Sequence, residues 1–446
     1  MVEKKVIFSS LANNQTEFWI NVSKKLKINY KSIIAFDNES TKKHAEKYLI
    51  DLTFKKKIIN LKLIKIYLRK YEIKNLKKTL NHEILNSETK NSYLILCKLT
   101  FYLIKLEDTF KNNNLIIFQE LGGFIQNLSI FFFCKKNGIK HYFLEPSFFS
   151  GRLHCIEDSF TDFSAKKKYS KISDSDLSNL LHHIVSKKKL VIPIKDKLHF
   201  QAPIKKFITF RNLFRFFYKI YLKTFLKYEF VFYQNFNTLQ KYLSEILSFI
   251  VFKKHYFNKL PKNFIYFPLH VPNDFALTLR ATEYQNQIIL INKICKIYKE
   301  NKDLYICIKE HPARIGALKL KKLLHNQNLI FLNPKMNNFD IFSKSLGVIT
   351  LNSKAGFEAI LSGNMVISLT HSFYSHYKLS EGPINIESLQ KYNFSRFKKT
   401  KNVNKKKNQH FFKKIYENSI VGELYSNDIT NIKYFSDSLK KVLDNN

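Results

Sequence analysis

The chain has 446 residues, of which 45% are hydrophobic and 25% charged, a composition that excludes a chain disordered throughout. Its length exceeds the usual size of one hydrophobic core and predicts two domains. The formal net charge is +40. Because Lys, Asn, Ile, Phe and Tyr are all abundant while Gly and Pro are scarce, an AT-rich genome alone accounts for such a bias. The total charge is therefore weak evidence for an anionic binding partner, and only local clusters of basic residues are used to predict one.

The five cysteines are scattered and form no CxxC pair or Cys/His array of metal-binding spacing. They predict a reducing compartment, and no metal site is expected. The opening MVEKKVIFSSL lacks the apolar stretch of a secretory signal, and nowhere do about 18 apolar residues run together. The sequence predicts a cytoplasmic protein that works at a membrane, if at all, from the inner surface.

Residues 1–150 predict an amino-terminal Rossmann-like domain. "KVIFSSLANNQTEFWINVSKKLK" has the pattern of a strand, a polar loop and an amphipathic helix, and "KSIIAFD" follows as a second strand. A lysine-rich helical stretch covers about residues 55–106. Beyond it, "NLIIFQELGG" predicts a strand and a turn, Gly138 ends the next helix, and "HYFLEP" is another strand. This order predicts parallel strands joined by right-handed crossovers.

Residues 151–260 are predicted to be a basic helical insertion or linker. Within "IKKFITFRNLFRFFYKIYLKTFLKY", one helical face carries Phe207, Phe210 and Phe214, while the cations include Arg211, Arg215 and Lys219. One interpretation is a basic amphipathic helix lying in a membrane interface. The other is a helix whose aromatic face packs on the protein body while its lysines are solvated.

The α/β rhythm returns in residues 261–385, which predict a carboxy-terminal Rossmann-like domain. Its predicted strands are "NFIYFPLHV", "DLYICIKEHP", "NLIFLNP", "LGVITLNS" and "NMVISLTHS", with helical segments between them. Residues 386–446 are expected to form a helical tail. The fold class predicted is therefore α/β, with two Rossmann-like domains facing each other across a cleft and a basic helical insertion.

Four polar clusters follow predicted strands. Since ligands bind at the carboxyl ends of parallel strands, these clusters are the candidate site. The members are Glu145, His270 with Asp274, Lys309 with Glu310 and His311, and Asn352 with Ser353. Pro312 cannot extend a central strand, so His311 is expected at the functional edge of its sheet.

The segment "NSKAGFEAIL" suggests a phosphate site. Asn352 or Ser353 is a suitable N-cap, and the amides from Lys354 onward point at any anion placed there, with Gly356 permitting close approach. An ordinary capped helix explains the same pattern. The absence of GxGxxG and Walker sequences argues against dinucleotide binding and P-loop NTP hydrolysis.

In this order, "GIKHYFLEPSFF", "FIYFPLHVPNDF", "YICIKEHP" and "GVITLNSKAGFEAILSGNMVISL" resemble motifs of the capsule polysaccharide synthesis and export family, the bacterial β-Kdo glycosyltransferases. The resemblance covers about residues 114–150 and 263–382. It implies a GT-B-like enzyme that transfers Kdo from CMP-Kdo, with retention, to a lipid-linked acceptor held on the amino-terminal side. It also implies no cofactor and no metal.

Carried over by position, the resemblance implies that Asp274 is the carboxylate forming a covalent glycosyl adduct and Glu145 the acid/base. It implies that His311 contacts the donor's phosphate and that Ser353 is a donor-binding hydroxyl. The further donor residues expected are Lys309, Asn352, Lys354, Gly356 and His270. His270 stands where the family has glutamine and Lys354 where it has threonine, and both departures bear on which donor is used.

Two alternatives stay open. A glycerol-phosphate or ribitol-phosphate transferase, or one with another nucleotide sugar, uses similar strand-exit histidines and a similar helix start. A non-catalytic module that binds a membrane or nucleic acid through its basic helix is the alternative of another class. Nucleic acid is not the expected partner, because no RNP, helix-turn-helix or zinc-finger spacing occurs. The protein is expected to be cytoplasmic and peripheral on the inner membrane, where the anionic surface of the inner leaflet attracts the basic helix.

Overall fold

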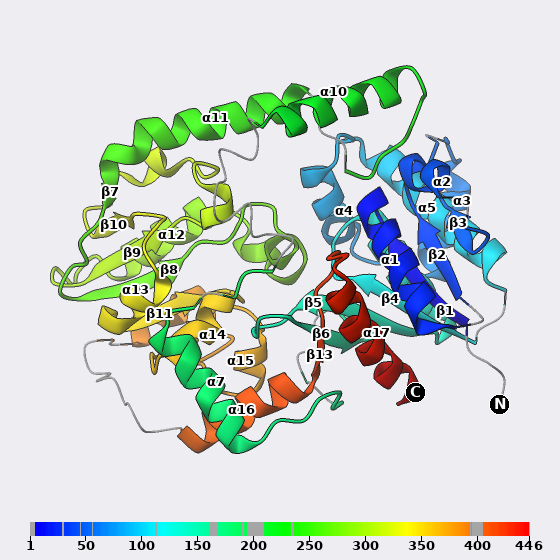
Figure 1. Cartoon of the computed structure of the whole chain (residues 1–446). Helices are drawn as coiled ribbons and strands as arrows, with labels where there is room; N and C mark the ends of the chain where they lie inside the picture. Colours follow the sequence, from blue (N-terminus) through cyan, green and yellow to red (C-terminus); the bar gives the residue numbers. More distant parts are fainter. Residues whose placement is uncertain are drawn as a thin grey trace.

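The computed structural model describes residues 5–28, 31–44, 46–55, 57–111, 114–160, 164, 167–189, 191–193, 209–232, 236–392, 394 and 405–445. Its described strands form two separate sheets, one of seven strands and one of six. Each sheet is covered by helices, and the two stand side by side in Figure 1. The predicted class, two Rossmann-like α/β domains facing each other, is confirmed.

The amino-terminal sheet has the strand order β13-β6-β5-β4-β1-β2-β3. The five strands from β5 to β3 pair in parallel, as the crossovers predict, while β6 and β13 pair antiparallel at one edge. The strands are β1 Lys5–Ser10, β2 Lys31–Ala35, β3 Leu49–Asp51, β4 Leu115–Glu120, β5 Lys140–Pro146, β6 Arg152–Glu157 and β13 Ser419–Val421. The helices are α1 Asn13–Leu26, α2 Asn38–Lys43, α3 Leu61–Lys70, α4 Leu76–Asn86, α5 Ser92–Thr109, α6 Ile125–Asn137 and α17 Ile429–Asp444.

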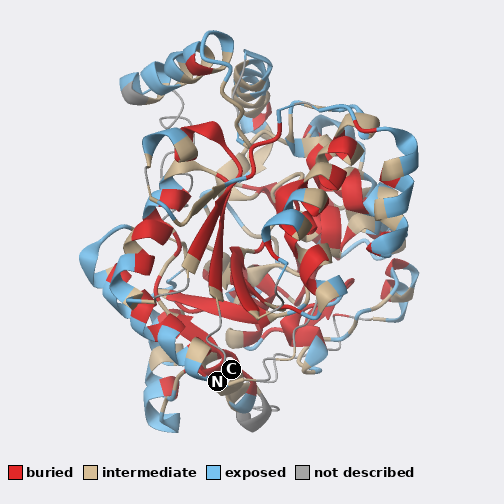
Figure 2. Cartoon of the chain, turned by 90° about the vertical axis from the view of Figure 1, so that its right-hand side faces the viewer, coloured by how far each residue is buried: buried red, intermediate tan, exposed pale blue. Residues whose placement is uncertain are grey.

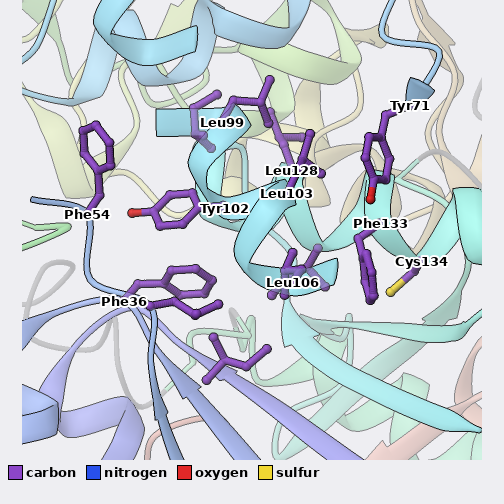
Figure 3. Packing of buried hydrophobic residues seen from close by; sticks show 14 of the residues in the cluster. Phe36, Phe54, Tyr71, Leu99, Tyr102, Leu103, Leu106, Leu128, Phe133 and Cys134 are labelled. Atoms are coloured by element: carbon purple, nitrogen blue, oxygen red, sulfur yellow. The ribbon is translucent and has the colours of Figure 1, made fainter. Parts of the chain in front are cut away.

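This sheet is apolar on both faces, because helices cover both. The central strands are buried along almost their whole length, as the red strands of Figure 2 show. On one face Trp19 stacks on Phe8 at 4.5 Å between ring centres. On the other, shown in Figure 3, Tyr102 of α5 packs edge-on against Phe36 at 5.0 Å. Burial of a large side chain contributes about 2 kcal/mol each, so these two layers hold the domain together.

The second sheet is entirely parallel, with the order β12-β11-β8-β9-β10-β7. Its strands are β7 Tyr256–Phe257, β8 Phe264–Pro268, β9 Tyr305–Lys309, β10 Leu329–Leu332, β11 Gly347–Thr350 and β12 Val366–Ser368. The helices are α12 Gln287–Ile297, α13 Asn338–Lys344, α14 Lys354–Leu361 and α15 Phe373–His376, with α7 Asp174–Ser186 and α16 Lys405–Glu417 packed together nearby. Each strand predicted between residues 261 and 385 is present.

The domain boundaries differ from the predicted ones. The amino-terminal domain does not end at 150, because β6 turns back at Gly151, with φ of +68°, and pairs with β5. Residues 386–446 are more than a tail, since β13 and α17 complete the first sheet and its helical cover. Phe435 of α17 meets Phe18 of α1 edge-on at 5.2 Å. These pairings join segments far apart in sequence, which no local pattern reports.

Two helices of the insertion, α10 Phe210–Thr224 and α11 Phe236–Phe252, lie along one side of the molecule and bridge the two domains (Figure 1). Lys223 of α10 pairs with Glu88 of the amino-terminal domain. Glu245 of α11 accepts two hydrogen bonds from Arg314 of the second domain. Gly316 lies against the carbonyl of Glu245, where a Cβ would come within 2.2 Å. Among the described residues, no helix has the length and apolarity needed to cross a membrane.

Candidate active site at the domain interface

The loop after β8 connects the domains. It contains a π-helical turn, Ala276–Arg280, that packs on α4. The Asn81 side chain donates to the carbonyl of Thr278 at 3.1 Å, and His82 contacts the Thr278 hydroxyl at 2.7 Å. The same loop carries Asp274, so docking on α4 fixes this carboxylate relative to the amino-terminal domain.

Asp274 lies just before the π-helical turn. Its Oδ1 accepts a hydrogen bond from the amide of Ala276 at 3.1 Å, and its carbonyl accepts from the amides of Leu277 and Thr278. Burial raises the pKa of Asp274, and the negative charge of Glu145 adds to this, whereas the Ala276 amide and Arg280 oppose it. The charge of Glu145 thus acts on Asp274, which puts the two candidate carboxylates in the same part of the interface.

Arg280, which sequence reasoning missed, joins Glu145 to this turn. Its guanidinium donates to both oxygens of Glu145 at 3.2 Å and to the carbonyl of Phe160 at 2.9 Å. Glu145 ends β5 in one domain, and Arg280 follows Asp274 in the other. A bidentate Arg–carboxylate pair is directional as well as strong, so it fixes the orientation of Glu145. The one feature of the sequence that could have identified Arg280 is that it is an arginine in an otherwise apolar segment.

Lys309, Glu310 and His311 do not converge. The Lys309 ammonium is buried and donates to the carbonyl of Met336 at 2.8 Å, and burial lowers its pKa to about 8. Glu310 accepts from the Tyr256 hydroxyl and from the amide of Gly316, and His311 Nδ1 accepts from the Ala313 amide at 3.3 Å. Successive side chains leave a strand in opposite directions, which accounts for the divergence. The expectation that Lys309 meets a donor phosphate at the strand exit is not supported by its position.

Two histidines are neutral at the ends of β8 and β9. Burial lowers the pKa of His270 to about 4. Burial first, and then the charges of His270 and Lys309, lower the pKa of His311 to about 3. The side chain of Gln287 clamps the backbone of His270, accepting from its amide at 2.8 Å and donating to its carbonyl at 3.1 Å. Both imidazoles are therefore uncharged hydrogen-bonding groups rather than cations at neutral pH.

The start of α14 differs from the predicted phosphate cradle. Ser353 is the N-cap, as expected, and its Oγ accepts from the Ala355 amide at 3.0 Å, while its carbonyl accepts from Gly356. Two of the amides expected to bind phosphate are thus already engaged. Gly356 leaves room for Tyr374, since a Cβ there would lie 2.6 Å from its ring. The side chain of Asn352 donates to the carbonyl of Ala276 at 3.2 Å and so holds the Asp274 loop.

Lys354 ties the two domains together. Its ammonium donates to the carbonyl of Ser147, beyond β5, at 3.0 Å. Together with Glu145, Arg280 and Asn352 it lines a cavity of about 30 Å³ at the interface. His154 of β6, also missed by the sequence analysis, faces this cavity with 1% exposure and has no hydrogen-bond partner for either ring nitrogen. Burial, and then the charges of Lys354, Arg280 and Arg152, lower its pKa to about 3.

The amphipathic helix α10 turns its aromatic face outward. Phe210 is 85% exposed and Phe214 65%, and Arg215 is exposed beside them. Lys219 does not share this face, because its ammonium donates to the carbonyl of Phe232 at 3.3 Å and lies over the Phe230 ring. Phe207 lies outside the described residues, as does the side chain of Arg211. The interpretation in which the aromatic face packs on the body is therefore wrong for the described part of this helix.

Within the described ranges, no three His, Cys, Asp or Glu side chains come together as a metal site requires. The interface instead offers two carboxylates from different domains, an arginine between them, a lysine and neutral imidazoles. Such a set can supply a nucleophile, a proton acceptor and neutral or cationic groups for an anionic substrate.

Residues 221–417 match the family model described as capsule polysaccharide biosynthesis protein. This match confirms the resemblance that the sequence motifs predict, and it includes Asp274, His311 and the start of α14. One curated relative, Protein FixF of Sinorhizobium fredii, is 28% identical over 116 residues, which are 26% of this chain and 28% of that protein. The aligned region thus spans less than a third of FixF.

Solved structures are similar over most of the chain at low sequence identity. The Thermosulfurimonas dismutans KpsC beta Kdo 2,7 transferase is 13% identical, with a TM-score of 0.40, covering 99% of this chain and 100% of that chain. The UDP-GlcNAc 2-epimerase from Neisseria meningitidis, bound to UDP-GlcNAc, is 10% identical, with a TM-score of 0.31, covering 99% of each. The fold described above rests on this chain's own strands and pairings.

Proposed function

We propose that the protein is a glycosyltransferase of capsular or surface polysaccharide synthesis. It transfers Kdo or a related acidic sugar from a CMP-activated donor to a lipid-linked acceptor, with retention. The observation that carries the proposal is that Asp274 and Glu145 come from opposite domains to one interface, where Arg280, in the turn that follows Asp274, pairs with Glu145. The family match supports the same activity class.

In the proposed reaction, the Asp274 carboxylate attacks the anomeric carbon of the donor as the bond to CMP breaks, giving a glycosyl–enzyme adduct. An acceptor hydroxyl then attacks that carbon and releases Asp274, and Glu145 takes the hydroxyl proton. Two inversions give retention. The raised pKa of Asp274 suits a group that gives up its charge on forming the adduct, while His270 and His311 donate hydrogen bonds to the departing phosphate. No cofactor takes part in these steps.

An acidic sugar suits the chemistry of the interface. Arg280, Lys354 and His154 surround the small cavity beside Glu145, and the first two are cationic. Their acceptors include the Glu145 carboxylate and the backbone carbonyls of Phe160 and Ser147, and a substrate carboxylate can bind the same cationic groups. We therefore assign recognition of the donor's carboxylate to this group.

A comparison of donors tests the proposal. Purified protein is incubated with CMP-Kdo, CDP-glycerol, CDP-ribitol or UDP-GlcNAc, and free nucleotide is measured. Release of CMP from CMP-Kdo alone is expected. Release of CMP from CDP-glycerol or CDP-ribitol, but not from CMP-Kdo, would move the function to a polyol-phosphate transferase, and no release from any donor would favour the non-catalytic alternative.

We also propose that the outer surface of α10 and α11 docks on the anionic inner leaflet from the cytoplasm. Besides the outward aromatic residues of α10, α11 exposes Leu243, Leu247 and Ile250 by 52%, 62% and 58%. Exposed apolar patches of this kind mark interaction sites. The exposed Arg215 and Lys227 complement anionic lipid phosphates, each contributing about 1 kcal/mol near the surface.

Replacing Phe210 and Phe214 by Ser should reduce co-sedimentation with phosphatidylglycerol vesicles by about tenfold or more, because each buried aromatic contributes about 2 kcal/mol. The control replaces Ile429 and Tyr434 of α17, which are 88% and 53% exposed, by Ser. That control should pellet as the wild type does. Equal pelleting of both variants would reject membrane docking through α10.

A further inference from the structure

A cavity of about 530 Å³ lies between the amino-terminal domain and the insertion. Its walls come from α4, α5 and α6, from the ends of β2 and β3, and from the segment that contains Lys223, Phe230 and Tyr242. This volume falls within the range of small-molecule sites, about 300–1,000 Å³. The cavity is distinct from the small one that holds Arg280 and Lys354.

One residue lining this cavity has a buried polar atom without a hydrogen-bond partner. Gln126, at the start of α6, is 1% exposed, and its amide nitrogen donates to the Tyr102 hydroxyl at 3.4 Å. Its Oε1 is buried and has no hydrogen-bond partner. A buried acceptor left unpaired costs about 1–3 kcal/mol, which a ligand hydroxyl donating to it would recover.

The other lining groups favour a neutral ligand. Phe36, Phe54 and Phe232 supply aromatic surface, on which the C–H faces of a sugar ring can pack. The lysines are paired with carboxylates: Lys98 binds Glu83 at 2.6 Å, and Lys223 binds Glu88. Because both lysines are already paired, a carboxylate or phosphate placed here would lose its water without gaining a cation of its own. The cavity therefore disfavours an anionic ligand.

The cavity adjoins both the reaction centre and the outer face of the bridging helices. Asn86, one of its lining residues, donates to the carbonyl of Asn273 at 2.9 Å, one residue before Asp274. Lys223, which lines the cavity, belongs to α10. The opposite face of α10 exposes Phe214 and Phe217. A ligand here can therefore reach toward Asp274 while a lipid attached to it stays at the surface of α10.

We propose that this cavity binds a neutral, hydroxyl-rich sugar unit of the acceptor glycan, an inference that rests on the proposed transferase function. Gln126 Oε1 accepts from one hydroxyl, Asn86 lies at the end toward Asp274, and the insertion closes one wall. The acceptor unit held here is thus unlike the acidic donor sugar. Binding at this cavity lets the enzyme distinguish acceptor from donor by charge.

Saturation-transfer NMR tests the proposal without any donor. The probes are the methyl glycosides of glucose, galactose and N-acetylglucosamine, with methyl glucuronide as the acidic counterpart. At least one neutral glycoside should bind, and the glucuronide should bind about tenfold more weakly or worse. Gln126→Leu and the rim-filling Thr89→Trp should each weaken the neutral ligand about tenfold.

Lys77→Trp, an exposed change on α4 away from the cavity, is the matched control and should leave binding unaltered. Failure of every neutral glycoside to bind, preference for the glucuronide, or binding untouched by both cavity variants would overturn the proposal. Nucleotide release from the donor is a separate measurement. Glycoside binding without any release would keep this cavity and reject the transferase, and release without glycoside binding would do the opposite.

Discussion

Asp274→Asn is expected to lower the rate of CMP release from CMP-Kdo by about a thousandfold or more, the scale on which loss of a catalytic nucleophile acts. The amide cannot form the glycosyl adduct, whereas its oxygen can still accept from the Ala276 amide as Oδ1 of Asp274 does. Because burial raises the pKa of Asp274, a neutral side chain in its place removes a desolvation cost. The variant should therefore unfold at the same temperature as the wild type or slightly above it.

Asp303→Asn is the matched control, since Asp303 is an exposed aspartate in the loop before β9. It should change neither the release rate nor the unfolding temperature. If Asp274→Asn kept its release rate within about tenfold of the wild type, Asp274 would not be the nucleophile. The covalent mechanism proposed above would then be abandoned, even with CMP-Kdo retained as donor.

The two sheets were predictable because each central strand is a short apolar run bounded by turn or cap residues. Buried parallel strands have this pattern, and β8, β9 and β11 all follow it. The positions of Asp274, Glu145 and His270 followed from the rule that polar residues after such strands gather at one edge. Several parallel pairs join consecutive strands, such as β4 with β5 and β8 with β9, which the alternation of strands and helices predicts. The pairs β1 with β4 and β8 with β11 join strands far apart in the sequence and are not given by local pattern.

Other features depend on contacts between distant segments. The pairing of β13 with β6 brings Ser419 opposite His154, and nothing near either residue reports it. Arg280 acquires its role only when β5 and the turn after β8 meet. The amphipathic pattern of α10 defined an apolar face but left open what covers it, because that depends on Lys219 and Lys223 turning toward the protein.

Arg280→Gln should reduce the free energy of unfolding by about 3 kcal/mol, because it leaves the Glu145 carboxylate partly buried without its cation. The two side chains are only 7% and 17% exposed, so solvent screens the pair weakly. Glu145→Gln should cost a similar amount by leaving the guanidinium unpaired. The double variant should cost less than the sum by about 2 kcal/mol, since neither charge then remains uncompensated. Urea unfolding of all four proteins measures this coupling.

The same cycle on Lys293 and Glu387 provides the comparison. That pair is 3.8 Å apart with side chains 56% and 64% exposed, so changing either residue should cost under about 1 kcal/mol. Arg280→Gln should also slow CMP release although Asp274 is intact, because Arg280 is the link that holds the Asp274 turn against Glu145. If the losses in free energy of unfolding of Arg280→Gln and Glu145→Gln simply added in the double variant, and CMP release were unaltered, the ion pair would neither couple the domains nor orient the two carboxylates.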